Sequence, residues 1–201
     1  MPMKLAVCVS GRGSNLMALL DALAGSRQAV VAVVLSNRAD APALELARQR
    51  GIPAESLDDH RDATEWLRRL RTHAVDLIVL AGYLKLVPPG VIAAYRDRIL
   101  NVHPALLPDF GGPGMYGHHV HEAVLRSGAT VSGATVHLVD EAYDQGRILA
   151  QARVPVLPDD TPATLAARVL RAEHRLLPAV VLRAAEAGRP VVLPEPLELS
   201  P

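Results

Sequence analysis

The sequence has 201 residues, half of them apolar, which is enough for one domain with a substantial core. Lysine plus arginine equals aspartate plus glutamate at 21 each, a balance that gives no indication of a nucleic-acid partner. The single cysteine, Cys8, allows no intramolecular disulfide and favours a reducing cytoplasm. No apolar run reaches the roughly 20 residues that a membrane span needs, and no signal peptide is recognisable, so we expect no membrane partner.

The chain begins with a strand, a glycine-rich turn and a helix. Apolar residues from Leu5 to Val9 predict a buried strand of a parallel sheet. The turn Ser-Gly-Arg-Gly-Ser-Asn at 10–15 leads into a helical pattern over 16–23. The N–H groups of such a turn and of the helix N-terminus form an anion site, where Ser14 or Asn15 caps the helix and contacts a phosphate. The alternative is that the glycines only make a tight turn.

The same turn matches the dinucleotide fingerprint only in part. Gly11 and Gly13 correspond to its first two glycines, but Leu16 occupies the place of the third. The next strand, Val30 to Leu35, is followed by Ser-Asn-Arg and not by an acidic residue that would bind a ribose. NAD is therefore disfavoured, Arg38 leaves NADP open, and a phosphomonoester is the favoured ligand.

Strands and helices continue to alternate up to residue 100. We expect helices over 41–50, 62–72 and 90–95, and a buried strand over 77–82. This alternation predicts a mostly parallel sheet with helices on both faces, which is a three-layer α/β fold. The apolar segment Tyr83–Val87 suits either a flat heterocycle or simple core packing.

A polar pair lies where the next strand ends. Residues Ile99 to Val102 predict a buried strand that Pro104 terminates, because proline has no N–H for the sheet. Asn101 and His103 are two residues apart, so on extended backbone their side chains share one side. An amide and an imidazole at such a strand end suit a site that handles a carbonyl group, through hydrogen bonding to an oxyanion and proton transfer. A structural histidine is the alternative.

A long loop and a histidine-rich helix start follow. Residues 104–117 are glycine- and proline-rich, which is typical of a lid or of a segment ordered by ligand. His118, His119 and His121 open a helix, and we find no second set of Cys, Asp or Glu at ligand spacing. We therefore expect no metal.

The pattern then changes from alternating strands and helices to two neighbouring strands. Strands over 134–139 and 148–156 with a short connection predict an antiparallel pair. The acidic connection at 140–146 either faces solvent or turns one carboxylate inward to orient a histidine and raise its pKa. Thr161 is expected to cap a final helix, and Val191–Leu193 to add an edge strand.

Three motifs together carry a resemblance to a known family: Gly-Arg-Gly-Ser-Asn at 11–15, Asn-Val-His-Pro-Ala-Leu-Leu-Pro at 101–108 and Asp-Gln-Gly at 144–146. With this combination the chain resembles the phosphoribosylglycinamide formyltransferases, folate-dependent enzymes of purine biosynthesis, from about residue 4 to about residue 190. The resemblance implies the formyltransferase fold as one domain over 1–201. In that fold a Rossmann-like phosphate-binding half (1–100) precedes a catalytic and folate-binding half (101–190) that holds the antiparallel strand pair.

The resemblance also implies roles for individual residues. The catalytic trio would be Asn101, His103 and Asp144. The substrate phosphate and glycinamide would be bound by Arg12, Gly13, Ser14, Asn15 and Glu173. The folate pocket would be formed by Arg61, Leu84, Lys85, Leu86, Val87, Asn101, Val139 and Asp140, and no metal is implied.

The implied reaction moves the formyl group of 10-formyltetrahydrofolate, the co-substrate, to the amine of 5'-phosphoribosylglycinamide. Asn101 and a protonated His103 would stabilise the oxyanion, while Asp144 would keep His103 charged and help to move the proton. The expected partners are small molecules, and the chain is expected to be a monomer or homodimer in the cytoplasm.

Three alternatives to this function stay open. Formyltetrahydrofolate deformylase would pass the formyl group to water. Methionyl-tRNA formyltransferase would be expected to carry a further C-terminal domain and a net positive charge. A phosphate- or NADP-binding module without catalysis would not require Asn101, His103 and Asp144 to converge.

Overall fold

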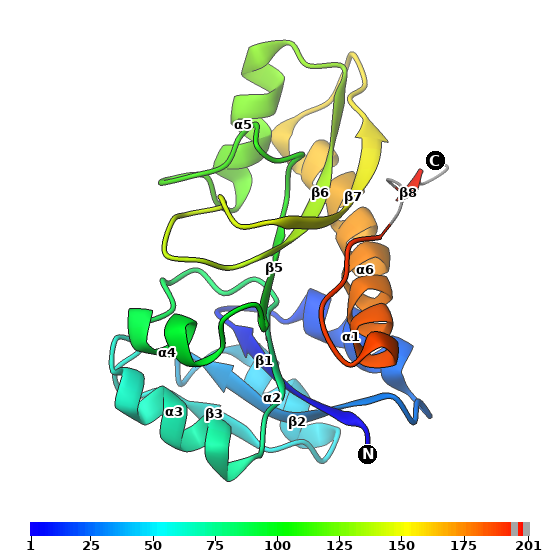
Figure 1. Cartoon of the computed structure of the whole chain (residues 1–201). Coiled ribbons are helices and arrows are strands. Elements are labelled where there is room, and N and C mark those ends of the chain that lie inside the picture. The colour runs from blue at the N-terminus through cyan, green and yellow to red at the C-terminus, as the bar shows by residue number, and fades with distance from the viewer. Residues whose placement is uncertain (194–196, 199–201) are drawn as a thin grey trace.

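The chain alternates strands and helices as far as β6, and β7 then follows β6 directly as its antiparallel neighbour (Figure 1). The computed structural model describes residues 1–193 and 197–198. The strands are β1 (Met3–Val9), β2 (Ala29–Ser36), β3 (Ala54–Ser56), β4 (Leu77–Leu80), β5 (Ile99–His103), β6 (Val131–Leu138), β7 (Ile148–Pro155) and β8 (Leu197–Glu198). The helices are α1 (Ser14–Leu23), α2 (Pro42–Gln49), α3 (Ala63–Thr72), α4 (Pro89–Ala94), α5 (His118–Ser127) and α6 (Pro162–Ala187).

The strands form one sheet in the order β3-β2-β1-β4-β5-β6-β7-β8. The pairs from β3 to β5 are parallel, whereas β5 with β6 and β6 with β7 are antiparallel. The predicted fold class, including the antiparallel pair, is confirmed. The strand order reverses between β1 and β4, and the crevice at such a switch point is where open α/β sheets bind ligands.

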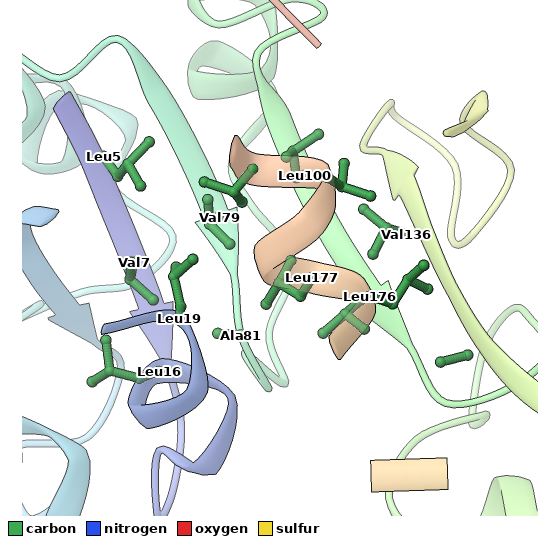
Figure 2. Close-up of a cluster of buried hydrophobic side chains, with 14 of the residues drawn as sticks. Leu5, Val7, Leu16, Leu19, Val79, Ala81, Leu100, Val136, Leu176 and Leu177 are labelled. Carbon is green, nitrogen blue, oxygen red and sulfur yellow. The ribbon is translucent and has the colours of Figure 1, made fainter. Parts of the chain in front are cut away.

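Two apolar clusters cover the two faces of the sheet. Figure 2 shows Leu16 and Leu19 of α1 and Leu176 of α6 among side chains of β1, β4 and β5. On the other face Trp66 of α3 and Val91 of α4 pack against alternate residues of the same strands, so this half of the sheet is buried on both sides.

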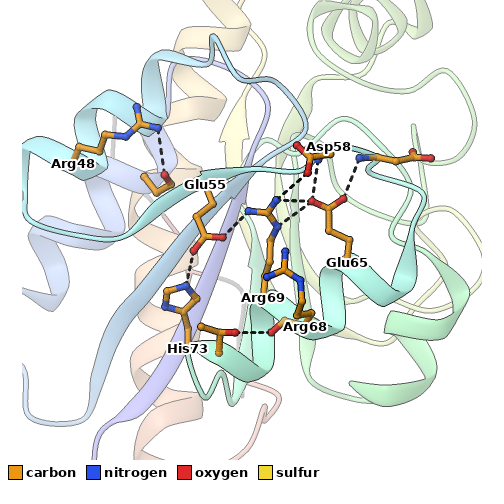
Figure 3. Close-up of polar contacts among 10 residues, drawn as sticks. Arg48, Glu55, Asp58, Glu65, Arg68, Arg69 and His73 are labelled. Atoms are coloured by element: carbon orange, nitrogen blue, oxygen red, sulfur yellow. Dashed lines mark hydrogen bonds and ion pairs between the residues drawn. The ribbon is translucent and has the colours of Figure 1, made fainter.

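A network of charged residues ties α3 to the edge of the sheet (Figure 3). Arg69 lies 2.6 Å from Glu55 of β3 and 2.6 Å from Glu65 one helical turn away. His73 lies 2.7 Å from the same Glu55. These contacts link α3 to β3, the edge strand that β2, β1 and β4 separate from β5.

Two local predictions are wrong. Neither Ser14 nor Asn15 caps α1, because Gly13 occupies the N-cap position in a left-handed conformation and no side chain accepts from the helix there. Val191–Leu193 is not a strand, although the Leu193 N–H donates to the Leu149 carbonyl at 2.8 Å. The strand that pairs with β7 is β8, further along the chain.

The other end of the long helix follows the prediction. Thr161 caps α6 by accepting from the Thr164 N–H, and Pro162 stands in the first turn. Across residues 1–193 and 197–198, no helix combines the length and apolar character needed to span a membrane.

Candidate active site

The polar pair at the end of β5 lies beside a cavity. His103 is 3% exposed and Asn101 is half-buried. Both line a cavity of about 580 Å³ that also holds Asp144 and Glu173. The chain thus brings together side chains from β5, from the β6–β7 loop and from α6.

Asp144 is the acid of the β6–β7 loop that turns inward. Its Oδ2 lies 3.6 Å from His103 Nδ1 and accepts from the Gly112 N–H at 2.9 Å. The loop can return this closely because residue 146 is glycine, since a Cβ there would collide with the Leu138 carbonyl oxygen. Of the two fates considered for the acidic connection, the inward one is therefore observed.

His137 is a site residue that the sequence prediction missed, because it was treated only as part of an alternating strand. Its Nε2 lies 3.0 Å from Asn101 Nδ2 and 3.5 Å from Asp144 Oδ1, and its Nδ1 lies 2.8 Å from the Leu138 carbonyl oxygen. It is 2% exposed and stands directly opposite Asn101 in the β5–β6 register. That register, which pairs residues 36 positions apart, is the signal that would have revealed it.

Burial decides the ionisation of His103. It lowers the pKa of His103 below the ordinary 6.5, and neither the charge of Asp144 nor the Phe110 carbonyl, 2.8 Å from Nε2, outweighs it. Asp144 does act to raise the pKa of His103, as expected, but burial lowers this pKa by more, so the further expectation that Asp144 keeps His103 charged does not hold in this conformation. Burial also acts to raise the pKa of Asp144, but contacts with His137, His103 and Gly112 lower it overall, so Asp144 is a carboxylate at neutral pH.

The glycine-rich turn lines a second, neighbouring cavity of about 470 Å³. Gly13 has φ +82°, and a Cβ at this position would lie 2.7 Å from Ala43 Cβ, so the turn requires glycine here. Gly13 and Ser14 line this cavity, and Arg12 lines both cavities. The expected anion site and the cavity at β5 are therefore adjacent.

Asn15 is 6% exposed and is the hydrogen-bond partner of Glu173, which lines the cavity at β5. Its Nδ2 donates to Glu173 Oε2 at 2.6 Å. Glu173 is 8% exposed, and its burial raises the pKa to about 7, with the hydrogen bond from Asn15 opposing this shift. The side chain of Asn15 is thus bonded to a carboxyl group, whereas the sequence suggested that it would contact a phosphate.

The proposed folate-binding residues are placed together with one exception. The cavity at β5 is lined by Leu84, Lys85, Leu86, Val87, Asn101, Val139 and Asp140. Leu84 and Leu86 are more than half exposed, whereas Tyr83 and Val87 at the two ends of this segment are buried. Arg61 does not line the cavity and pairs with Asp59 at 3.0 Å on the surface.

The first part of the 104–117 loop is anchored to the antiparallel strands. Thr135 Oγ1 donates to the Ala105 carbonyl at 2.6 Å and accepts from the Leu107 N–H at 3.0 Å. Gln151 of β7 donates to the Leu107 carbonyl at 2.8 Å. These bonds fix the start of the loop, and residues 112 and 114–117 line the cavity.

Histidines at the start of α5 have an acidic neighbour that the sequence prediction did not recognise. Potential ligand atoms of His118, His119 and Glu122 lie within 4.8 Å of one another on an exposed surface. The absence of a metal therefore stays a prediction.

A mostly parallel sheet with an amide and an imidazole at the end of β5, joined by a carboxylate from the β6–β7 loop, defines an α/β protein whose site suits chemistry on a carbonyl group. The family model described as formyl transferase matches residues 3–181. The chain belongs to this formyl transferase family.

Within this family, the chain is similar to several proteins named phosphoribosylglycinamide formyltransferase. The chain is 48% identical over 186 residues to the chloroplastic phosphoribosylglycinamide formyltransferase of Arabidopsis thaliana, covering 89% of this chain and 64% of that protein. It is 38% identical to phosphoribosylglycinamide formyltransferase of Escherichia coli, covering 89% and 85% of the two chains. The crystal structure of glycinamide ribonucleotide transformylase 1 from Symbiobacterium toebii aligns with a TM-score of 0.86 at 39% identity, covering 96% and 95%. The chain thus spans less than two thirds of the plant relative's length.

Proposed function

We propose that this protein transfers the formyl group of 10-formyltetrahydrofolate to the amine of 5'-phosphoribosylglycinamide. One observation carries the proposal: the cavity that gathers Asn101, His103 and Asp144 is adjacent to a glycine turn suited to a phosphate. The names of the relatives that match over most of this chain support the same reaction.

The cavity has features that fit a folate. A flat heterocycle needs apolar walls and a few polar groups to orient it. Leu84 and Leu86 present exposed apolar side chains there, and Asp140 and the backbone after β4 offer polar groups. The co-substrate supplies an activated formyl group next to Asn101 and His103, and no metal is required for this role. Arg61 lies outside the cavity lining, so its contact with the folate stays a prediction.

The side chains around the reacting carbon have separate roles in this mechanism. The substrate amine attacks the formyl carbon, and Asn101 donates a hydrogen bond to the oxygen on which negative charge develops. That charge raises the pKa of the adjacent His103, which then stabilises it as an imidazolium. His103 and Asp144 move the proton from the attacking amine to the departing nitrogen as the carbon–nitrogen bond of the donor breaks.

Different residues around the two cavities bind the phosphate and the glycinamide part of the substrate. Gly13 and Ser14 at the start of α1 offer backbone N–H groups to the phosphate, and Arg12 adds a positive charge between the cavities. Asn15 and Glu173 present a bonded polar pair to the glycinamide part of the substrate.

A two-substrate assay tests the proposal. The protein is incubated with 10-formyltetrahydrofolate, with and without phosphoribosylglycinamide, and formylated product and free formate are measured. Transfer to the amine is expected; formate release at the same rate without the amine would favour the deformylase alternative. The separation of 3.6 Å between His103 and Asp144 favours an enzyme over a non-catalytic phosphate- or NADP-binding module.

Substitutions then test the catalytic roles. We expect His103→Ala and Asp144→Asn each to lower kcat by about 100-fold or more, since each removes a group that acts on the transition state. Cys8 is fully buried in β1, so Cys8→Ala is expected to retain turnover within a few-fold. Comparable activity in all three variants would refute the assignment. The cytoplasmic location and the monomeric or homodimeric state stay predictions.

A further inference from the structure

We propose that His137 is a positioning residue that orients the carboxamide of Asn101 toward the carbonyl oxygen of the formyl group. This inference rests on the proposed function and assigns a role to a side chain outside the trio. It follows from the hydrogen bonds at the two ring nitrogens of His137.

The first bond fixes the tautomer. His137 Nδ1 lies 2.8 Å from the Leu138 carbonyl oxygen, and both groups are buried. A carbonyl oxygen can only accept, so Nδ1 must carry the hydrogen. In the neutral ring Nε2 is then left with a lone pair and acts as an acceptor.

The second bond fixes the amide. Asn101 Nδ2 lies 3.0 Å from His137 Nε2, which is hydrogen-bond distance. Because this nitrogen has a lone pair, the group facing it must be the NH₂ end of Asn101 and not its oxygen. One N–H of the amide is used in this bond, and the second remains free for an acceptor in the cavity that Asn101 lines.

The backbone holds this pair rigidly. Asn101 and His137 stand directly opposite each other in the antiparallel β5–β6 register, and His137 is 2% exposed. Without an acceptor at this place, rotation of the Asn101 amide by half a turn would present its oxygen to the developing negative charge. A residue that prevents this rotation therefore acts on the transition state through Asn101.

Asp144 offers a competing explanation, since its Oδ1 lies 3.5 Å from the same nitrogen of His137. This distance is longer than the one to Asn101, and Asp144 has other contacts with His103 and the Gly112 N–H. In this competing explanation His137 orients Asp144 and not Asn101. The two explanations predict different behaviour in double variants.

The kinetic test compares His137→Leu with the conservative His137→Gln. Leucine removes the acceptor, so kcat is expected to fall by about 30- to 100-fold, approaching the loss of one oxyanion donor, with KM changed by less than about threefold. Glutamine has a carbonyl oxygen that can accept from Asn101, so this variant is expected to recover most of the lost kcat. Equal kcat values for the two variants would overturn the proposal, and circular dichroism confirms that each is folded.

Double variants identify the residue through which His137 acts. In an Asn101→Ala background, His137→Leu is expected to lower kcat by less than about twofold further, because the amide to be oriented is gone. In an Asp144→Asn background its full effect should persist. The reverse pattern, or losses that multiply in both backgrounds, would overturn the proposal in favour of support to Asp144 or of a general structural role.

A spectroscopic measurement is independent of activity. In ¹⁵N-histidine-labelled protein at pH 7.5, the ring signals that disappear in His137→Gln should show a protonated Nδ1 and an unprotonated Nε2. The opposite tautomer, or an imidazolium, would refute the proposed orientation of Asn101. If the wild-type protein transfers no formyl group, the proposed function fails, while the tautomer still decides whether His137 accepts from Asn101.

Discussion

The burial of Glu173 leads to a quantitative prediction about stability. Its pKa is raised to about 7 from the ordinary 4.5 because the carboxyl group is buried against α1. Between these two pH values the folded protein binds more protons than the unfolded chain, so this group lowers stability as the pH rises from 4.5 through 7. Each unit of difference between the folded and unfolded pKa corresponds to about 1.36 kcal/mol, so the free energy of unfolding is lowered by about 3 kcal/mol above pH 7.

Replacement by glutamine isolates this effect. Glu173→Gln removes the charge, and its amide oxygen can still accept from Asn15 Nδ2. We compare the free energy of unfolding of the variant with that of the wild type at each pH. This difference is expected to shift in favour of the variant by about 3 kcal/mol between pH 4.5 and pH 8, because only the wild type must bury a charge at the higher pH. Urea denaturation at pH 4.5, 6, 7 and 8 measures the difference.

The control is Glu186→Gln, on an exposed position of the same helix. Its stability difference from the wild type is expected to vary little with pH. If Glu173→Gln shows the same flat profile as this control, Glu173 is charged without penalty in the folded protein, and the explanation of its pKa from burial is refuted.

Two further substitutions have matched controls. Gly13→Ala is expected to lower the free energy of unfolding by about 1–3 kcal/mol and to raise the KM for phosphoribosylglycinamide. The reason is that φ is +82° and that the new Cβ would lie 2.7 Å from a side-chain carbon of α2. The control is Gly11→Ala, where the new Cβ would meet open space, and an equal effect of this variant would contradict the reason given. Asp160→Asn is expected to cost about 2 kcal/mol at pH 7 through its ion pair with Arg168 at 2.6 Å. Because hydrogen bonds from Arg168 lower the pKa of Asp160 below 3.8, the stabilisation is present above that pH and is lost as the pH falls further. Urea denaturation at pH 7 and pH 3 checks this, and a similar loss in the exposed Asp159→Asn would contradict it.

Most elements could be predicted because their signals are local. Helices expected over 41–50, 62–72 and 90–95 are found at Pro42–Gln49, Ala63–Thr72 and Pro89–Ala94, since apolar periodicity and turn residues mark them in the sequence. The predicted cap of α1 is wrong because the N-cap position falls on Gly13, whose left-handed conformation glycine adopts readily, and not on Ser14 or Asn15.

Site residues were predictable only where a motif marked them. Asn101 and His103 share one strand end, and the inward turn of Asp144 was one of two alternatives. His137 was missed because its contact with Asn101 depends on which strands pair and in which register, and apolar alternation does not specify that. The edge strand was misplaced for the same reason: Val191–Leu193 is apolar, but the residues that pair with β7 lie further along the chain.

The ionisation of the cavity shows why a nearby carboxylate is not sufficient to charge a histidine. Burial lowers the pKa of His103 and raises that of Glu173, so both groups favour their neutral forms in the same enclosed region. Asp144 is the exception, because its pKa is lowered overall and the Gly112 N–H donates a hydrogen bond to its carboxylate. A negative charge that appears on the formyl oxygen would change this balance by adding a second anion close to His103. His103 would then gain its proton as the reaction proceeds, and its attraction to the oxyanion would be stronger in the transition state than in the ground state, which is the condition for raising kcat.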